Sequence, residues 1–253
     1  MAIVRPYLRW PVAQNVHSRA RASIEARAQP DRTPPMAISE ELRSECADIW
    51  ERQHRHPFVT GIGDGTLDVN RFRFWVRQDY LFLIEYGRVL AFAAARAPDL
   101  ASMSRFAELT HSTLTTEMDL HRSFCGELGI SRADLEAERM ARTTRGYTDF
   151  LVRVAAQADF ALVLAALLPC MWGYSEIGQR LAGRGRPADP RYAAWIEMYA
   201  SDEFAALAAW CREIADGVGA DAGARTREAM GRTFRTSSEY ELAFWQMAFD
   251  ECQ

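Results

Sequence analysis

Apolar residues recur along this chain at the spacing of an α-helix, three and four residues apart. The clearest case is the stretch 72–86, where apolar side chains fall at positions i, i+3, i+4 and i+7 and form one continuous face. No stretch alternates apolar and polar residues for long enough to predict a β-strand. The sequence therefore predicts an all-α fold, a single-domain bundle of about eight or nine helices.

The expected helices are separated by short breaks. Ser39 is expected to cap a first helix that ends near Gln53, and Asp68 to cap the second. The glycine-rich segment 61–66 between them is expected to be a turn, because a phosphate-binding glycine loop would follow a strand. Further helices are expected over 99–128, 133–141, 143–157, 159–183, 189–199, 202–217 and 222–251.

The N-terminal segment differs from the rest of the chain. It contains six arginines against Glu25 and Asp31, and it ends in a proline-rich run. Residues 1–36 are predicted to be an Arg-rich, disordered N-terminal extension, with a true start at Met36 or a transit peptide as alternatives. Residues 37–253 are predicted to form the helical domain.

The amino-acid composition excludes several kinds of catalytic and binding site. All 30 basic residues are arginine, which excludes lysine Schiff bases, a pyridoxal-phosphate lysine and a P-loop lysine. The net charge of −4 gives no overall attraction to nucleic acid or to an anionic membrane. The five cysteines are widely spaced and form no CxxC pair, which favours a reducing, cytoplasmic setting over a disulfide framework or a zinc knuckle.

Cys170 follows Pro169 near the end of the longest apolar stretch, residues 160–172. That stretch is too short to span a bilayer, so a buried core helix is expected. A proline inside a helix removes a backbone hydrogen bond and costs about 3 kcal/mol. Strain of this kind beside a thiol makes Cys170 a candidate nucleophile, although buried cysteines more often serve only in packing.

Two carboxylates fall on apolar helix faces. Asp79 lies in the apolar stripe of the second helix, where a carboxylate is costly unless it is paired. It is expected either to pair with an arginine or to bind an amine or ring nitrogen of a ligand. Glu241 shares a face with Phe244 and Trp245 in the last helix. It is expected either to reach solvent from the core edge or to act as a general acid/base with a raised pKa.

Tyrosines and a Glu–His pair complete the candidates. Tyr174 shares a helix face with the thiol, and Tyr147 and Tyr199 belong to apolar segments. A pocket with these groups would suit a flat heteroaromatic ligand. Glu117 and His121 lie four residues apart and could bind iron, but bundle iron sites take about four to six ligands from several helices. A helix-surface or interhelical polar pair is the alternative.

The chain resembles the TenA/thiaminase II family, also called aminopyrimidine aminohydrolases, over roughly residues 39–250. The motifs, in order, are HPFVTGIGDGTL at 56–67, QDY at 78–80, EMDLH at 117–121, AALLPC at 165–170 and SSEYE at 237–241 with FW at 244–245. The resemblance implies a heme-oxygenase-like all-α fold, usually assembled as a homotetramer, without a metal or an organic cofactor.

The resemblance also implies an activity. The family hydrolyses 4-amino-5-aminomethyl-2-methylpyrimidine to ammonia and the hydroxymethyl pyrimidine used in thiamine salvage, and cleaves thiamine by the same chemistry. It implies that Cys170 is the nucleophile, Glu241 the acid/base and Asp79 the group that holds the amidine-like edge of the pyrimidine. The substrate-binding residues it implies beside Asp79 are Phe82, Tyr147, Tyr174 and Tyr199. Phe82 departs from members with tyrosine there, so a hydroxyl near the thiol is lost.

Two other functions stay open on the sequence. One is a metal-dependent oxidase of the heme-oxygenase-like fold that uses Glu117 and His121, and the other is a noncatalytic pyrimidine-binding or regulatory protein. The expected partners are a small pyrimidine and further copies of the chain, with no nucleic acid and no membrane. Thiamine, the aminopyrimidine and its N-formyl form cannot be ranked from sequence, because selectivity depends on pocket shape around the leaving group.

Overall fold

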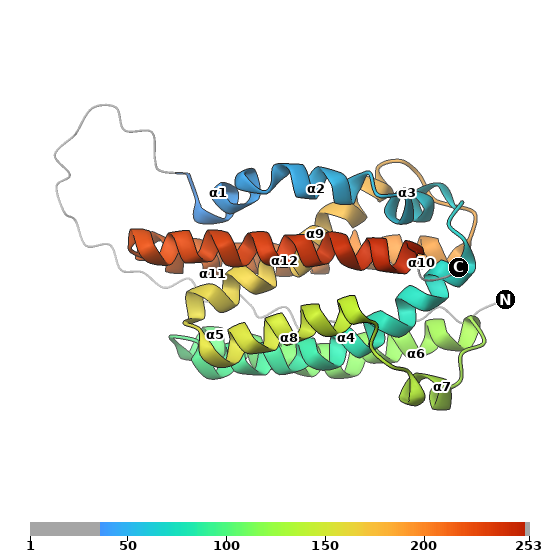
Figure 1. Ribbon diagram of the computed structural model, residues 1–253, viewed down its shortest axis with the longest axis horizontal. Helices are drawn as coiled ribbons and strands as arrows, with labels where there is room; N and C mark the ends of the chain where they lie inside the picture. The colour runs from blue at the N-terminus through green and yellow to red at the C-terminus, as the bar shows by residue number, and fades with distance from the viewer. Residues whose placement is uncertain (1–35, 251–253) are drawn as a thin grey trace.

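The computed structural model describes residues 36–250, apart from the side chain of Leu120 (Figure 1). The expectations for the N-terminal extension therefore lie outside the described residues, except at Met36. Within 36–250 the chain is helical almost throughout and contains no strand, which confirms the all-α prediction. The α-helices are α1 Ile38–Glu45, α2 Ala47–His54, α3 Pro57–Asp64, α4 Val69–Arg96, α5 Leu100–Ser112, α6 Met118–Glu127, α7 Arg132–Ala137, α8 Arg142–Gln157, α9 Phe160–Ala182, α10 Pro190–Tyr199, α11 Asp202–Ala220 and α12 Ala224–Asp250.

The described residues form more helices than expected. The first expected helix is broken at Cys46, where φ is −109° and ψ is 18°, so it becomes α1 and α2. The segment 61–66 was expected to be a turn, but most of it is helical, and both Gly61 and Gly63 lie inside α3. A side chain at Gly63 would meet Leu181 Cδ2 at 2.7 Å, so this glycine allows close packing rather than a turn. Of the three glycines in the segment 61–66, only Gly65 takes the left-handed conformation, with φ of +78°.

The start of α1 and the segment 99–128 also differ from expectation, whereas the start of α4 agrees with it. Ser39 does not cap α1: Ala37 holds that position, and the buried Ser39 donates from its N–H and hydroxyl to Asp216 of α11 at 2.8 and 3.1 Å. Asp68 caps α4 as expected and accepts from the Asn70 N–H at 2.7 Å. The expected helix over 99–128 is interrupted by a π-helical turn, Thr113–Glu117, between α5 and α6.

The helices form three layers, with α9 and α12 in the middle (Figure 1). Helices α1 to α3 lie on one side, and α4, α5, α6 and α8 lie on the other. Helix α9 packs against α12, α11, α10, α8 and α4, and Pro169 lies inside it. By length and composition alone α9 could cross a membrane, but 72% of its most apolar window is buried in the bundle. It is therefore the central core helix that the sequence indicated.

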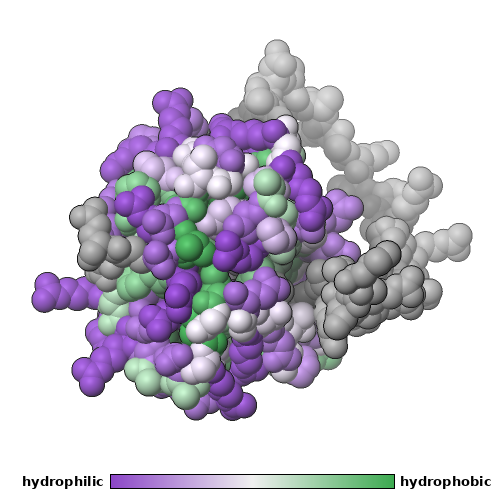
Figure 2. Space-filling model, turned by 90° about the vertical axis from the view of Figure 1, so that its right-hand side faces the viewer, coloured by the Kyte–Doolittle hydropathy of each residue, from purple (hydrophilic) through white to green (hydrophobic). Residues whose placement is uncertain are grey.

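The end of the bundle shown in Figure 2 is mostly hydrophilic. Its most hydrophobic residues lie in a central band, and weaker hydrophobic residues are scattered around it. Elsewhere, four large hydrophobic side chains of α4, α5 and the π turn are exposed: Phe92, Leu100, Met103 and Leu114.

Helices α9 and α10 approach each other closely at Gly178. A Cβ atom there would lie 2.5 Å from the carbonyl carbon of Tyr199 and 2.7 Å from the backbone nitrogen of Ala200. Because the backbone would have to move, we expect Gly178→Ala to lower the free energy of unfolding by about 3 kcal/mol. Urea denaturation measures this change.

Gly173 of the same helix provides the matched control. A Cβ there would meet no atom within 4 Å. Alanine has the higher helix propensity, so Gly173→Ala should be neutral or stabilising by up to about 1 kcal/mol. Equal stability of the two variants would contradict the close approach at Gly178.

Candidate active site

Five helices bring the seven predicted site residues together in the middle of the bundle. The thiol of Cys170 is electrostatically coupled to Glu241 and Asp79, and the hydroxyls of Tyr174 and Tyr199 are coupled to the same three groups. Tyr147 interacts with Glu241 and with the thiol, and its ring lies 5.1 Å from that of Phe82. The residues come from α4 (Asp79, Phe82), α8 (Tyr147), α9 (Cys170, Tyr174), α10 (Tyr199) and α12 (Glu241).

Cys170 is the partly accessible cysteine of α9. Its neighbours Pro169 and Met171 are buried, whereas Cys170 keeps some accessible surface although it lies in the interior of the bundle. Burial raises the pKa of the thiol well above its usual range, and the nearby carboxylates, Glu241 foremost, raise it further. Without a compensating group the resting site therefore holds a thiol and not a thiolate.

Glu241 is held by a short chain of hydrogen bonds. The Tyr147 hydroxyl donates to Oε1 of Glu241 at 2.6 Å and lies 3.1 Å from the Ser237 hydroxyl, which donates to the Ala166 carbonyl oxygen at 2.7 Å. Burial raises the pKa of Glu241 to about 8, although the bond from Tyr147 opposes that shift. Glu241 is thus mostly protonated at neutral pH and can donate a proton next to Cys170.

Asp79 is paired, but with a histidine instead of the arginine considered from the sequence. Nε2 of His121 lies 2.6 Å from Oδ2 of Asp79, and Nδ1 lies 3.0 Å from the Glu117 carbonyl oxygen. Burial lowers the pKa of His121, but its hydrogen bond and charge interaction with Asp79 outweigh burial, so the pKa is raised. A protonated His121 donates to both acceptors and orients the Asp79 carboxylate.

Glu117 ends the π-helical turn, a feature that is frequent at functional sites. Burial raises the pKa of its side chain to about 7, with His121 lowering it and Asp79 raising it. Within the described part of the chain, no group of three or more His, Cys, Asp or Glu side chains is arranged to hold a metal ion. Glu117 and His121 interact with each other and with Asp79 in the interior of the bundle.

Aromatic rings enclose these polar groups. The Phe82 ring stacks on Tyr86 at 5.5 Å and 23°, and it lies 5.9 Å from Phe244. The rings of Tyr174 and Tyr199 are 4.9 Å apart. A site with such walls and a few fixed polar groups fits a flat ligand.

Two residues of the site were missed in the sequence. Tyr86 lies four residues after Phe82 on the same face of α4, and its buried hydroxyl is next to the thiol. Ser237 lies one turn before Glu241 and supports Tyr147. Both residues lie four positions from a predicted site residue, so helical spacing could have indicated them. Spacing within one helix does not show which side chains contact each other between helices.

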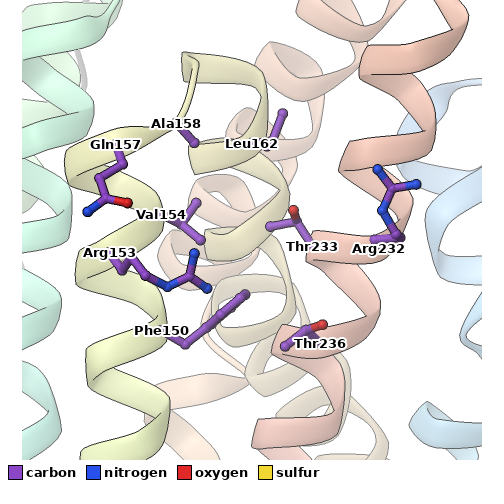
Figure 3. A pocket seen from close by; sticks show the side chains of 9 residues that line it. All are labelled: Phe150, Arg153, Val154, Gln157, Ala158, Leu162, Arg232, Thr233 and Thr236. Atoms are coloured by element: carbon purple, nitrogen blue, oxygen red, sulfur yellow. The ribbon is translucent and has the colours of Figure 1, made fainter.

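An open pocket of about 230 Å³ lies outside this site, between α8, α12 and the start of α9 (Figure 3). Its polar groups include Arg153, Arg232 and Thr233, and its apolar groups include Phe150 and Leu162. None of the predicted site residues lines this pocket.

Solved structures share this arrangement of helices. A TenA homologue from P. horikoshii OT3 matches with a TM-score of 0.79 and 31% identity, over 85% of this chain and 99% of that chain. A domain with a heme-oxygenase-like fold from Shewanella denitrificans OS217 matches with a TM-score of 0.68 and 14% identity, over 85% of this chain and 93% of that chain; this likeness concerns the fold alone. The chain is thus an all-α protein of the heme-oxygenase-like class.

The family follows from the sequence comparisons. The model of the TENA/THI-4/PQQC family matches residues 43–251. A curated aminopyrimidine aminohydrolase of Halalkalibacterium halodurans is 42% identical over 217 residues, 85% of this chain and 97% of that protein. The chain belongs to the TENA/THI-4/PQQC family, which confirms the resemblance found in its motifs.

Proposed function

We propose that this protein is an aminopyrimidine aminohydrolase of thiamine salvage. It hydrolyses 4-amino-5-aminomethyl-2-methylpyrimidine to the hydroxymethyl pyrimidine and ammonia. The observation that carries this proposal is the meeting of a partly accessible thiol, Cys170, with the protonated Glu241 and the paired Asp79 among stacked aromatic rings. The relative from H. halodurans, 42% identical, carries the name of the same activity.

Asp79 binds the pyrimidine. Because His121 holds Oδ2, Oδ1 is the oxygen that accepts from the 4-amino group. The hydrogen bond from His121 fixes the carboxylate before the substrate enters. The rings of Phe82, Tyr174 and Tyr199 contact the faces and edges of the pyrimidine.

The chemistry uses Cys170 and Glu241 in turn. The thiolate of Cys170 adds to a carbon of the pyrimidine ring while Glu241 gives its proton to a ring nitrogen, so aromaticity is interrupted. The bond from the exocyclic methylene to nitrogen then breaks, and ammonia leaves with the electron pair. Water adds to the methylene, and Glu241 recovers a proton as the sulfur is eliminated and the ring is restored.

The substrate itself favours the thiolate. The groups with the largest charge effect on the Cys170 pKa are Glu241, Asp79 and Glu117, which raise it when they are ionised. An alkyl amine is cationic at neutral pH, and a cation near the thiol lowers the thiol pKa. The ammonium group of the bound substrate therefore lowers the thiol pKa, against the effect of the ionised acidic groups. It is also the protonation state in which the amine can leave as ammonia.

Asp79→Asn is expected to weaken binding of the aminopyrimidine about 30-fold or more, because a buried charged acceptor loses its charge. Isothermal calorimetry measures the dissociation constant. Glu85→Gln is the matched control, since Glu85 lies on the same helix but pairs with Arg88 at the surface, so its affinity should equal that of the wild type. An unchanged affinity of Asp79→Asn for the aminopyrimidine would show that Asp79 has only a structural role.

Steady-state turnover with thiamine, the aminopyrimidine and its N-formyl form, measured in parallel, tests the proposed function. We expect hydroxymethyl pyrimidine from the aminopyrimidine, and kcat/KM values rank the three leaving groups. Tight binding of the pyrimidine without any turnover would instead identify a noncatalytic binding protein.

The protein acts as a cytoplasmic homotetramer in this proposal. The cysteines of the described residues, Cys46, Cys125, Cys170 and Cys211, are free thiols, which suits a reducing compartment. The exposed hydrophobic side chains of α4, α5 and the π turn supply an apolar surface for another copy. Light scattering should give four times the chain mass of 28.6 kDa; a monomer would exclude the tetramer.

A further inference from the structure

The hydroxyl of Tyr86 is buried and has no regular hydrogen bond within the described residues. Only 3% of Tyr86 is exposed, and its oxygen is among the few buried polar side-chain atoms without a partner. Buried hydroxyls are nearly always paired, because leaving one unpaired is costly. An orphan hydroxyl inside a candidate active site therefore calls for a partner that forms during the reaction.

The partner it faces is the thiol of Cys170. Among the main influences on Cys170, the Tyr86 hydroxyl acts as a hydrogen-bonding group and lowers the thiol pKa, against burial and the carboxylates that raise it. Cys211 of α11 is also near this hydroxyl, but Cys170 has the larger effect on it. A hydroxyl that finds a weak acceptor in a neutral thiol finds a strong acceptor in a thiolate.

Neighbouring rings fix the direction of Tyr86. Phe82, one turn earlier on α4, stacks on the Tyr86 ring at 5.5 Å and also packs 5.1 Å from Tyr147, which holds Glu241. Phe82 is the position at which some family members have a tyrosine hydroxyl. In this chain the next turn of the same helix carries a hydroxyl, Tyr86, that influences the thiol.

We propose that Tyr86 is a positioning residue for the nucleophile: its O–H donates a hydrogen bond to the Cys170 thiolate and supplies the hydroxyl that Phe82 lacks. This inference rests on the proposed role of Cys170. Burial raises the pKa of Tyr86 well above its usual range, so the phenol keeps its proton and serves only as a donor. The thiol proton leaves to solvent or substrate, and Tyr86 remains unchanged through the cycle.

Tyr86→Phe tests the inference by removing one oxygen. The rate of Cys170 alkylation by iodoacetamide, followed from pH 6 to 10 by peptide mass spectrometry, should fall about ten-fold at neutral pH. The rate should rise with pH in both proteins, and the rate of the variant should stay below that of the wild type throughout this range. Alkylation of Cys46 and Cys125 in the same samples is the internal reference and should not change. In turnover, kcat should fall about ten-fold while KM stays near the wild-type value.

The double variant Phe82→Tyr/Tyr86→Phe separates the hydroxyl from packing. It moves the hydroxyl back by one turn and should restore the alkylation rate to within about three-fold of the wild type. The inference is overturned if Tyr86→Phe alkylates like the wild type, or if its loss is not recovered in the double variant. Alkylation needs no substrate, so absence of turnover in the wild type would reject the proposed function without deciding the role of Tyr86.

Discussion

Cys170→Ser is expected to abolish hydrolysis of the aminopyrimidine and to leave the fold intact. A serine hydroxyl is not ionised at neutral pH and is a much weaker nucleophile than a thiolate. We expect kcat to fall by at least about 10³-fold. Ammonia release measures the loss, and circular dichroism with thermal unfolding verifies the fold. Cys170 is partly accessible rather than tightly packed, so the exchange of sulfur for oxygen should cost little stability.

Cys125→Ser is the matched control for this variant. Cys125 is a buried free thiol on α6, and burial raises its pKa to about 11. None of the site carboxylates is among the influences on it, so activity should stay within about three-fold of the wild type. An active Cys170→Ser enzyme, or equal losses in the two variants, would remove the thiol from the mechanism.

Glu241→Gln is expected to lower kcat about 10²- to 10⁴-fold with little change in KM. The amide keeps the size of the side chain and can still accept from Tyr147, but it cannot give a proton to the pyrimidine and take one back. Because the pKa of Glu241 is raised to about 8, the acid is available below that pH and is lost above it. The wild-type kcat/KM should therefore fall as pH rises through about 8, because this parameter reports the pKa of the free enzyme.

The same substitution tests the raised pKa without any substrate. The pKa of Glu241 is raised from its ordinary value of 4.5 to about 8 in the folded protein, so its contribution to stability is fully present below 4.5 and is lost as pH rises through about 8. Glu241→Gln should gain stability relative to the wild type between pH 5 and 8 and level off above that. A difference in unfolding temperature that does not vary with pH would contradict the buried, neutral carboxyl.

The sequence alone predicted those features of the fold that depend on residues close together in the chain. Helical spacing predicted the all-α class, the cap at Asp68 and the core helix that contains Pro169, because side-chain periodicity and capping act within a few residues. Six of the seven site residues were already candidates from their helix faces or apolar segments, and the family resemblance added Phe82 and the role of each. The structure brings all seven together around the thiol.

Features that depend on contacts between helices were not predictable in this way. Gly63 resembled a turn residue because glycine in a helix is unfavourable, yet it is needed where α3 meets Leu181. Ser39 resembled an N-cap, but Asp216, far along the chain, takes its hydrogen bonds. The bond between His121 and Asp79 likewise joins residues on different helices, so no spacing rule indicates it.

Product analysis with metal-depleted wild-type protein tests the central claim most directly. After dialysis against a chelator, the protein is incubated with 4-amino-5-aminomethyl-2-methylpyrimidine, and ammonia and hydroxymethyl pyrimidine are quantified together. We expect both products in equal amounts over many turnovers, with no added metal or organic cofactor. No product from folded protein, or product that appears only when iron is added, would contradict hydrolysis by the thiol and carboxyl groups of this site.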